Sequence, residues 1–212
     1  MSNFEALNEA IIKSDINKAV EETKKALDAG TDVQDILDKG LISPMDEVGA
    51  RFASGKMFVP QMLRSAKAMQ ECMALIQPFF QEQDINFKGK IVIGTVKGDL
   101  HDIGKNLVSM MMEGAGFTVI DIGVDIPADV FVEKVKETGA DILAMSALLS
   151  TTMPGMKATI EALQNAGLRE KVKVMIGGAP VSDSFAGQIG ADSYAPDAGS
   201  AVIEAKKILG LS

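Results

Sequence analysis

The sequence is poor in the residues that build disulfide frameworks and multi-ligand metal sites. It contains one cysteine, Cys72, and one histidine, His101, in 212 residues. A single cysteine excludes an internal disulfide. With so few nitrogen and sulfur ligands, a tetrahedral zinc site would depend on carboxylates, which is an uncommon donor set for zinc. The sequence therefore supports neither a disulfide-stapled protein nor a zinc protein.

Long basic runs and long apolar runs are also missing. The chain has 21 Lys and Arg against 29 Asp and Glu, a net charge of -8, which makes it a poor candidate for binding nucleic acid or anionic membranes. No stretch approaches the ~20 apolar residues of a membrane span. Residues 1–5 lack the basic start of a signal peptide, and no apolar run follows them. We therefore expect a soluble cytoplasmic protein without a nucleic-acid or membrane partner.

The chain has enough apolar residues to build a core, and their spacing changes along its length. Hydrophobic residues make up 47% of the sequence and charged residues 24%, a globular balance. Apolar residues recur at helical spacing before a polar, aperiodic stretch at 81–86 and in short continuous runs after it. We therefore predict two domains, a helical one at 1–86 and an α/β one at 87–212.

The first domain carries several helix start and stop signals. Gly30 and Gly40 follow apolar stripes and are predicted to end two helical elements. Ser43 before Pro44 is typical of an N-cap followed by proline at the first helical position, and Pro60 is predicted to open a last long helix. Four or five helices with short connections predict a small bundle.

The second domain alternates β-branched runs with helical patterns. The expected strands are 91–95, 118–121, 142–146, 172–176 and a weak fifth at 192–195. The expected helices are 104–115, 128–138, 152–166, 181–189 and 198–209. Continuous apolar strands separated by helices predict a parallel sheet that is covered on both faces. Five such units in this length predict a flavodoxin-like or Rossmann-like sheet.

Ligands of open parallel sheets bind beyond the carboxyl ends of the strands, so the loops there carry the candidate chemistry. The first such loop holds Asp99 and His101, the third begins at Ser146, and the fourth strand runs into Gly177 and Gly178. All three segments are expected to meet at one edge.

Each of these signals also has an ordinary structural explanation. A lone histidine is usually a surface residue, although a carboxylate beside it is typical of a metal ligand, because it fixes the ring. Ser150 or Thr151 would serve as a helix cap. Gly177 and Gly178 would form a tight turn or allow something large to approach the backbone.

Three familiar motifs are absent from these loops. Gly98 and Gly104 are separated by five residues instead of the four of a P-loop, and Asn106 stands where a P-loop has Ser or Thr. No G-x-G-x-x-G follows the first strand, and no G-x-S-x-G is present for a serine hydrolase.

Together the three segments resemble the cobalamin-binding domain of corrinoid methyl-transfer proteins. That family carries D-x-H-x-x-G, then S-x-L, then G-G. Here residues 99–104 read D-L-H-D-I-G, residues 146–148 read S-A-L, and residues 177–178 read G-G. All three parts occur in order at predicted strand ends, and this combination is far more specific than any single part.

The helical half is similar to the cap domain of cobalamin-dependent methionine synthase. The similar stretch includes Gly49, Phe52, residues 55–58 and Pro60-Gln61. The resemblance therefore covers nearly the whole chain, which leaves no room for substrate or folate domains. The chain looks like the stand-alone corrinoid protein of a three-component methyltransferase system, a subunit that is not catalytic alone. Such systems serve methanol, methylamines, methylated thiols, quaternary amines or aryl methyl ethers.

The resemblance implies roles for particular residues. His101 would replace the cofactor's own dimethylbenzimidazole as the lower axial ligand of cobalt, the base-off/His-on state. Asp99 would hydrogen-bond the far side of the imidazole, and Thr152, in place of a serine, would complete a proton relay. Further cobalamin contacts are implied for Gly98, Leu100, Asp102, Ile103, Gly104, Ser146, Leu148, Ser150, Gly177, Gly178 and Ala198. Phe52 and Val59 would cover the upper, methyl-bearing face.

The resemblance also implies three protein partners. A substrate-specific methyltransferase would load the methyl group, and a second methyltransferase would pass it to tetrahydrofolate or coenzyme M. A reductive activating protein would restore cobalt after accidental oxidation. The sequence identifies neither the methyl donor nor the final acceptor.

Three other functions compete with this interpretation. A radical mutase subunit shares D-x-H-x-x-G but lacks this cap. A cobalamin-sensing regulator would need a DNA-binding segment and a basic surface. A flavodoxin-like module that binds no corrinoid would leave the ordered set of motifs as coincidence.

Overall fold

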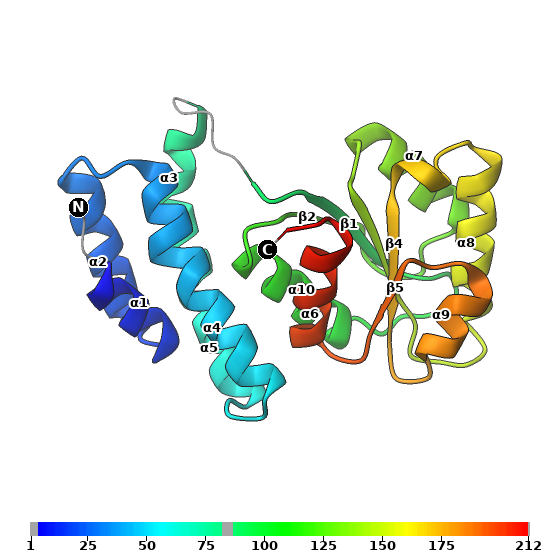
Figure 1. Cartoon of the computed structure of the whole chain (residues 1–212), viewed down its shortest axis with the longest axis horizontal. Coiled ribbons are helices and arrows are strands. Elements are labelled where there is room, and N and C mark those ends of the chain that lie inside the picture. Colours follow the sequence, from blue (N-terminus) through cyan, green and yellow to red (C-terminus); the bar gives the residue numbers. More distant parts are fainter. Residues whose placement is uncertain (1–3, 82–86, 212) are drawn as a thin grey trace. The chain divides into compact units, whose positions relative to one another are not determined.

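A computed structural model of the chain describes residues 4–81 and 87–211. The chain forms two compact units, Met1–Phe87 with Glu113–Gly116, and Lys88–Met112 with Phe117–Ser212. The first unit is helical and the second is built around a parallel sheet (Figure 1). This confirms the predicted fold class, a helical N-terminal part followed by a five-stranded Rossmann-like sheet. Of the expected linker at 81–86, only Gln81 is among the described residues, at the end of a 3-10 helix.

The helical unit buries the apolar stripes that the sequence shows. Its elements are α1 (Glu5–Ile12), α2 (Ile16–Asp28), α3 (Val33–Asp35), the π-helix η1 (Ile36–Ile42), α4 (Ser43–Ala53), α5 (Val59–Ile76) and the 3-10 helix η2 (Gln77–Gln81). Leu7, Ile11 and Met62 are among its fully buried side chains. Pro60 lies in the first turn of α5, where proline costs no helical hydrogen bond.

Gly30 ends α2 as predicted. Its φ is +69°, in the left-handed region that favours glycine. The Gly30 N–H donates to Leu27 O at 2.9 Å, and the Thr31 N–H donates to Ala26 O at 3.0 Å. These two bonds form a Schellman motif, which satisfies carbonyls left over at the helix end.

The predictions for Gly40 and Ser43 are wrong. The π-helix η1 runs through Gly40 and continues into α4, and Ser43 has helical dihedral angles without a side-chain cap. A Cβ at Gly40 would lie 2.8 Å from Leu7 Cδ2 and 3.0 Å from Phe4 Cδ1. The glycine therefore serves close packing against α1, and it does not end the helix.

The second unit contains a parallel sheet in the order β2-β1-β3-β4-β5. Its strands are β1 (Lys90–Thr95), β2 (Thr118–Asp121), β3 (Ile142–Ser146), β4 (Lys173–Gly177) and β5 (Ser193–Ala195). Each strand begins and ends within one residue of its predicted bounds. The sequence predicts β1, β3 and β4 well because their burial makes them continuously apolar. The edge strand β2 is only partly buried, and its β-branched residues identify it.

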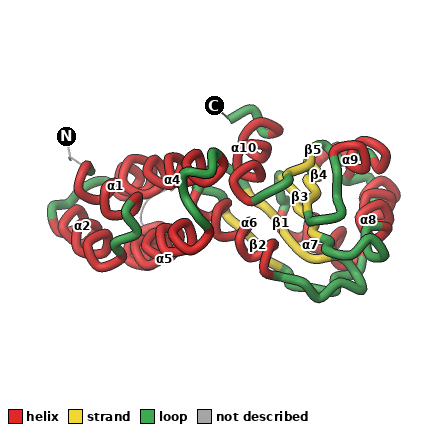
Figure 2. The backbone as a smooth tube through the Cα atoms, turned by 90° about the horizontal axis from the view of Figure 1, so that it is seen from below, coloured by secondary structure: helices red, strands yellow, loops and turns green. Residues whose placement is uncertain are grey.

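Helices cover both faces of this sheet. They are α6 (Ile103–Gly114), α7 (Ala128–Thr138), α8 (Pro154–Asn165), the 3-10 helix η3 (Arg169–Lys171), α9 (Asp183–Ile189) and α10 (Ala198–Ile208). One core joins α7, α8 and α9 to the sheet through Phe131, Ile160 and Ala186. Figure 2 shows α6 and α10 on the other side of the sheet from α8 and α9. Across residues 4–81 and 87–211, no helix has the length and apolar character needed to cross a membrane.

Candidate functional site

The three sequence segments meet at the carboxyl edge of the sheet. Thr95 at the end of β1 is in register with Ser146 at the end of β3. Ser146 is in register with Gly177, which in turn pairs with Ala195 at the end of β5. The loops that leave these strands therefore start side by side, as the sequence predicts.

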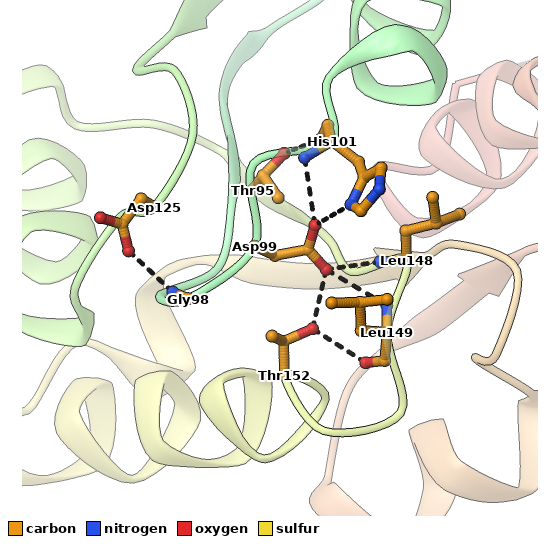
Figure 3. A network of polar contacts seen from close by, with 8 residues as sticks. All are labelled: Thr95, Gly98, Asp99, His101, Asp125, Leu148, Leu149 and Thr152. Carbon is orange, nitrogen blue, oxygen red and sulfur yellow. Dashed lines mark hydrogen bonds and ion pairs between the residues drawn. The ribbon is translucent and has the colours of Figure 1, made fainter.

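Asp99 is the centre of a hydrogen-bond network between two of these loops (Figure 3). Its carboxylate is fully buried. Oδ1 accepts from His101 Nδ1 at 2.7 Å and from the His101 N–H at 3.1 Å. Oδ2 accepts from the N–H groups of Leu148 at 2.8 Å and Leu149 at 3.2 Å, and lies 2.7 Å from Thr152 Oγ1. The loop after β1 is thereby joined to the loop after β3.

This network fixes the charge of Asp99 and the tautomer of His101. Burial opposes ionisation of Asp99, but hydrogen bonds from Thr152, His101 and Leu148 outweigh it and hold the pKa of the carboxyl well below its usual range. An ionised carboxylate only accepts, so Nδ1 of His101 carries the hydrogen and Nε2 of the neutral ring holds the lone pair. The His101 side chain is 51% exposed, and its other ring nitrogen points away from Asp99 in Figure 3. The ring therefore offers a ligating nitrogen of fixed orientation to the surroundings.

The Thr152 hydroxyl lies between two acceptors. Its Oγ1 is 2.7 Å from Asp99 Oδ2 and 2.8 Å from the carbonyl oxygen of Leu149. A hydroxyl has one hydrogen, so it donates to one of the two at a time. This geometry is compatible with the relay that the resemblance implies.

The alternative prediction that Ser150 or Thr151 caps the next helix is wrong. Residues 150–153 form a turn, and α8 begins at Pro154, preceded by Met153 without a side-chain cap. A proline in the first turn needs no hydrogen-bond partner for its nitrogen. Pro154 therefore fits the first position of α8, which starts two residues later than the sequence predicts. Ser150 itself is exposed.

Large apolar side chains are exposed next to His101 in the chain and on the loop after β3, which bonds to Asp99. Leu100 is 71% exposed and Ile103 85%, and Leu148 and Leu149 are each more than 40% exposed. Exposed apolar side chains on loops beside an imidazole of fixed orientation are typical of a ligand or partner surface. We call Leu100, Ile103, Leu148 and Leu149 the apolar rim.

The three glycines of the predicted motifs have different surroundings. Gly178 has φ +125°, and a Cβ there would lie 1.9 Å from the carbonyl oxygen of Ala147, so this turn requires glycine. A Cβ at Gly177 would lie 3.0 Å from Ala195 O. By contrast, a Cβ at Gly104 would meet nothing within 4 Å. The first two glycines allow close backbone packing, and the third leaves open space at the start of α6.

The remaining predicted residues occupy varied positions. Asp102 is exposed and accepts from Asn106 Nδ2 at 3.1 Å. Ala198 is buried as the first residue of α10. Phe52 is half-buried on α4 and Val59 is exposed at the start of α5, both in the helical unit. The covering role of Phe52 and Val59 stays a prediction.

Asp125 is a site residue that sequence reasoning missed. It follows β2, and its Oδ1 accepts from the Gly98 N–H at 2.7 Å (Figure 3). In the sequence it looks like an ordinary turn aspartate before Pro127. The one local sign is that β2 ends at the same edge as β1, so its loop starts beside the His101 loop.

A carboxylate-held imidazole beside exposed apolar side chains, at the carboxyl edge of a parallel sheet, fits the α/β cobalamin-binding class that the sequence resembles. Two family models described as "B12 binding domain" match the chain, one over residues 89–203 and the other over residues 4–77. The chain belongs to the B12-binding corrinoid proteins.

Known relatives match over nearly the whole length. The Dimethylamine corrinoid protein 1 of Methanosarcina acetivorans is 47% identical, over 99% of this chain and 100% of the relative. A cobalamin-binding protein from Desulfitobacterium hafniense, solved by crystallography, is 33% identical, with a TM-score of 0.79 over 98% of each chain. One chain of the methanol:cobalamin methyltransferase complex MtaBC of Methanosarcina barkeri matches with a TM-score of 0.88 and 29% identity. The match covers 99% of this chain and 80% of the chain in the complex.

Proposed function

We propose that this chain carries a methyl group on bound cobalamin, with His101 as the lower axial ligand of cobalt in place of the cofactor's dimethylbenzimidazole. The observation that carries the proposal is how His101 is held and exposed. Its Nδ1 is bound by a buried, ionised Asp99, and the ring is half exposed. A carboxylate on the far nitrogen is the usual support of a metal-ligating histidine, because it fixes the tautomer and raises ligand basicity.

The surroundings of His101 fit a corrinoid. The apolar rim offers a surface for a flat, largely apolar macrocycle, and the open space at Gly104 lies at the start of α6, next to Ile103. Ser146, Gly177 and Gly178 would receive the nucleotide tail, because Ser146 and Gly177 lie in register at the same edge as the His101 loop. Gly98, Asp102, Ser150 and Ala198 are proposed as further contacts around these groups.

The protein residues hold and tune the cofactor. When bound, cobalamin supplies a cobalt centre that accepts and releases a methyl group. Asp99 would orient the imidazole, and the Thr152 hydroxyl, 2.7 Å from Asp99 Oδ2, would be the outer member of the proton relay. Phe52 and Val59 of the helical unit would shield the methyl-bearing face from water between transfers.

Three partners complete the proposed function. A substrate-specific methyltransferase would load the methyl group, a second would pass it to tetrahydrofolate or coenzyme M, and a reductive activating protein would rescue oxidised cobalt. The solved relative in a methanol:cobalamin methyltransferase complex supports the first partner. The relative named for dimethylamine makes methylamines the first donors to test. The match to residues 4–77 supports a methyl carrier over a mutase subunit without a helical cap.

The test is an absorption spectrum of the protein after incubation with hydroxocobalamin and desalting. Wild type is expected to retain the corrinoid, and His101→Ala is expected to change the visible spectrum and weaken retention. Lys136→Ala, which removes an exposed side chain on α7, is the control and should match wild type. If folded wild type retains no corrinoid, the proposal fails. If His101→Ala keeps the wild-type spectrum, cobalamin binding survives but axial ligation by His101 does not.

A further inference from the structure

The His101 loop is also held from the side opposite Thr152. In the sheet, β1 lies between β2 and β3. The bonds from Asp99 to Leu148, Leu149 and Thr152 reach only the β3 side. A second set of contacts joins the same loop to the segment after β2.

Asp125 makes the contacts at the beginning of the loop. Its Oδ1 accepts from the Gly98 N–H at 2.7 Å, and its carboxylate pairs with Lys97 Nζ at 3.1 Å. Its own N–H donates to the carbonyl oxygen of Asp99 at 3.0 Å. One residue therefore bonds three consecutive residues, 97–99, of the His101 loop.

Asp121 makes the contact at the other end of the loop. Its carboxylate pairs with Lys105 Nζ, and the Lys105 side chain is only 2% exposed. Lys105 also donates to Asn106 Oδ1 at 2.7 Å, and Asp121 Oδ1 accepts from the Gly123 N–H at 2.9 Å. A buried ammonium group is costly without a carboxylate partner, so this pair ties the start of α6 to the end of β2.

The backbone of Asp125 indicates that its position is specific. Its φ is +57°, and it is one of two non-glycine residues among the described ones with positive φ. Asp tolerates this left-handed conformation better than most residues, but glycine is the usual choice. An ordinary turn would use the side chain within the turn itself. Here it reaches Gly98, 27 residues earlier in the sequence.

We propose that Asp121 and Asp125, which we call the β2 brace, are positioning residues for His101. The brace sets where the loop carrying Asp99 lies relative to the sheet, whereas Asp99 sets how the ring is turned. Asp99 holds the ring while its carboxylate also reaches Leu148, Leu149 and Thr152 on the β3 side. On the β2 side, the backbone bonds of the described residues hold only the start of the loop, through Thr95 and Asp99, so the two carboxylates of the brace are expected to keep residues 97–105 where Asp99 can make all of these bonds. This inference rests on the proposed role of His101 as a cobalt ligand.

The single histidine allows a test without cofactor. In apo protein labelled with ¹⁵N, the two imidazole nitrogens give unambiguous signals. Wild type is expected to show the Nδ1–H tautomer at an alkaline pH where the ring is neutral, and all variants are compared at that pH. Asp125→Gly keeps the left-handed backbone but loses the carboxylate, and it should broaden these signals or mix the tautomers. Asp125→Asn keeps an acceptor for Gly98 and should stay near wild type. Glu137→Gln, which breaks the exposed pair with Lys134 on α7, is the matched control.

Corrinoid affinity provides the second measurement. Loss of a group that supports a metal ligand typically weakens binding by about 10–100-fold, and for a brace one bond further out we expect about tenfold weaker hydroxocobalamin binding in Asp125→Gly. Asp121→Asn tests the other half of the brace and stands in if Asp125→Gly does not fold, with the same change in the His101 signals expected.

The two measurements separate this inference from the proposed function. Wild-type imidazole signals in both Asp125→Gly and Asp121→Asn would overturn the brace, whatever the affinity for corrinoid. Disturbed signals with rescue by Asp125→Asn support it. If wild type binds no corrinoid, the proposed function fails, while a change in the apo spectra would still show that the brace positions the ring.

Discussion

The loop after β1 and the turn after β4 lie at the same edge of the sheet but hold their shapes in opposite ways. The first depends on added contacts, since the Asp99 carboxylate accepts from four donors in addition to Thr152. The second depends on a missing side chain, since a Cβ at Gly178 would overlap Ala147 O at 1.9 Å. Loss of one hydrogen bond weakens the first loop only in part, because the other bonds remain. A side chain that overlaps the backbone of the second cannot be accommodated unless the chain itself moves.

The largest effect is therefore expected from Gly178→Ala. The added Cβ meets a backbone carbonyl that cannot move cheaply, because the Ala147 N–H donates to Gly177 O in the adjoining ladder. The positive φ adds strain of its own. We expect the free energy of unfolding to fall by at least about 3 kcal/mol, measured by urea denaturation.

Gly190→Ala separates the two causes. Gly190 also has a left-handed conformation, with φ +77°, but a Cβ there would meet nothing within 4 Å. Backbone strain alone should cost about 1 kcal/mol. Equal losses at Gly178 and Gly190 would mean that the overlap with Ala147 contributes nothing, and the contrast with the His101 loop would collapse.

A middle-sized effect is expected from Thr152→Val in the loop network. The change keeps the side-chain shape and removes the hydroxyl that lies against the ionised Asp99. Hydrogen bonds to charged groups contribute about 1.5–3 kcal/mol, so the free energy of unfolding should fall by that amount in urea denaturation. The remaining donors should keep Asp99 in place.

Two controls sharpen this prediction. Thr152→Ser retains the hydroxyl and should recover most of the loss. Thr159→Val removes a hydroxyl that donates to the uncharged Gly155 O at 2.8 Å, and it should cost less, about 0.5–1.5 kcal/mol. A Thr152→Val protein as stable as wild type would show that the hydroxyl bond to Asp99 is not part of what holds the loop.

The same contrast explains what the sequence could predict. The buried strand β3 is continuously apolar and has the predicted bounds, and the half-buried edge strand β2 was found from its β-branched residues. Asp99 and His101 were found because chemistry-bearing residues stand out beside a strand end. The link from Asp99 to Thr152 was not readable from spacing and came only from a family resemblance.

Features that depend on tertiary neighbours could not be predicted. Gly40 has the local pattern of a helix stop, yet it packs against Leu7 inside a continuous helix. Asp125 has the pattern of a turn residue, and its bond to Gly98 exists only because β2 and β1 are adjacent. In each case the residue type was visible in the sequence, but the neighbour that gives it a role was not.

The smallest effect on stability, and the sharpest separation of folding from binding, is expected from Gly104→Ala. Gly104 lies in the first turn of α6 beside His101, and a Cβ there would meet nothing within 4 Å. Alanine favours a helix over glycine, so the free energy of unfolding should stay unchanged or rise by up to about 1 kcal/mol in urea denaturation. The methyl group would, however, occupy the space that the proposed cofactor needs. Overpacking by about 1.4 kcal/mol corresponds to about tenfold weaker hydroxocobalamin binding. Unchanged affinity in a protein of unchanged stability would place the corrinoid away from this side of the His101 loop, and the open space at Gly104 would then need another explanation.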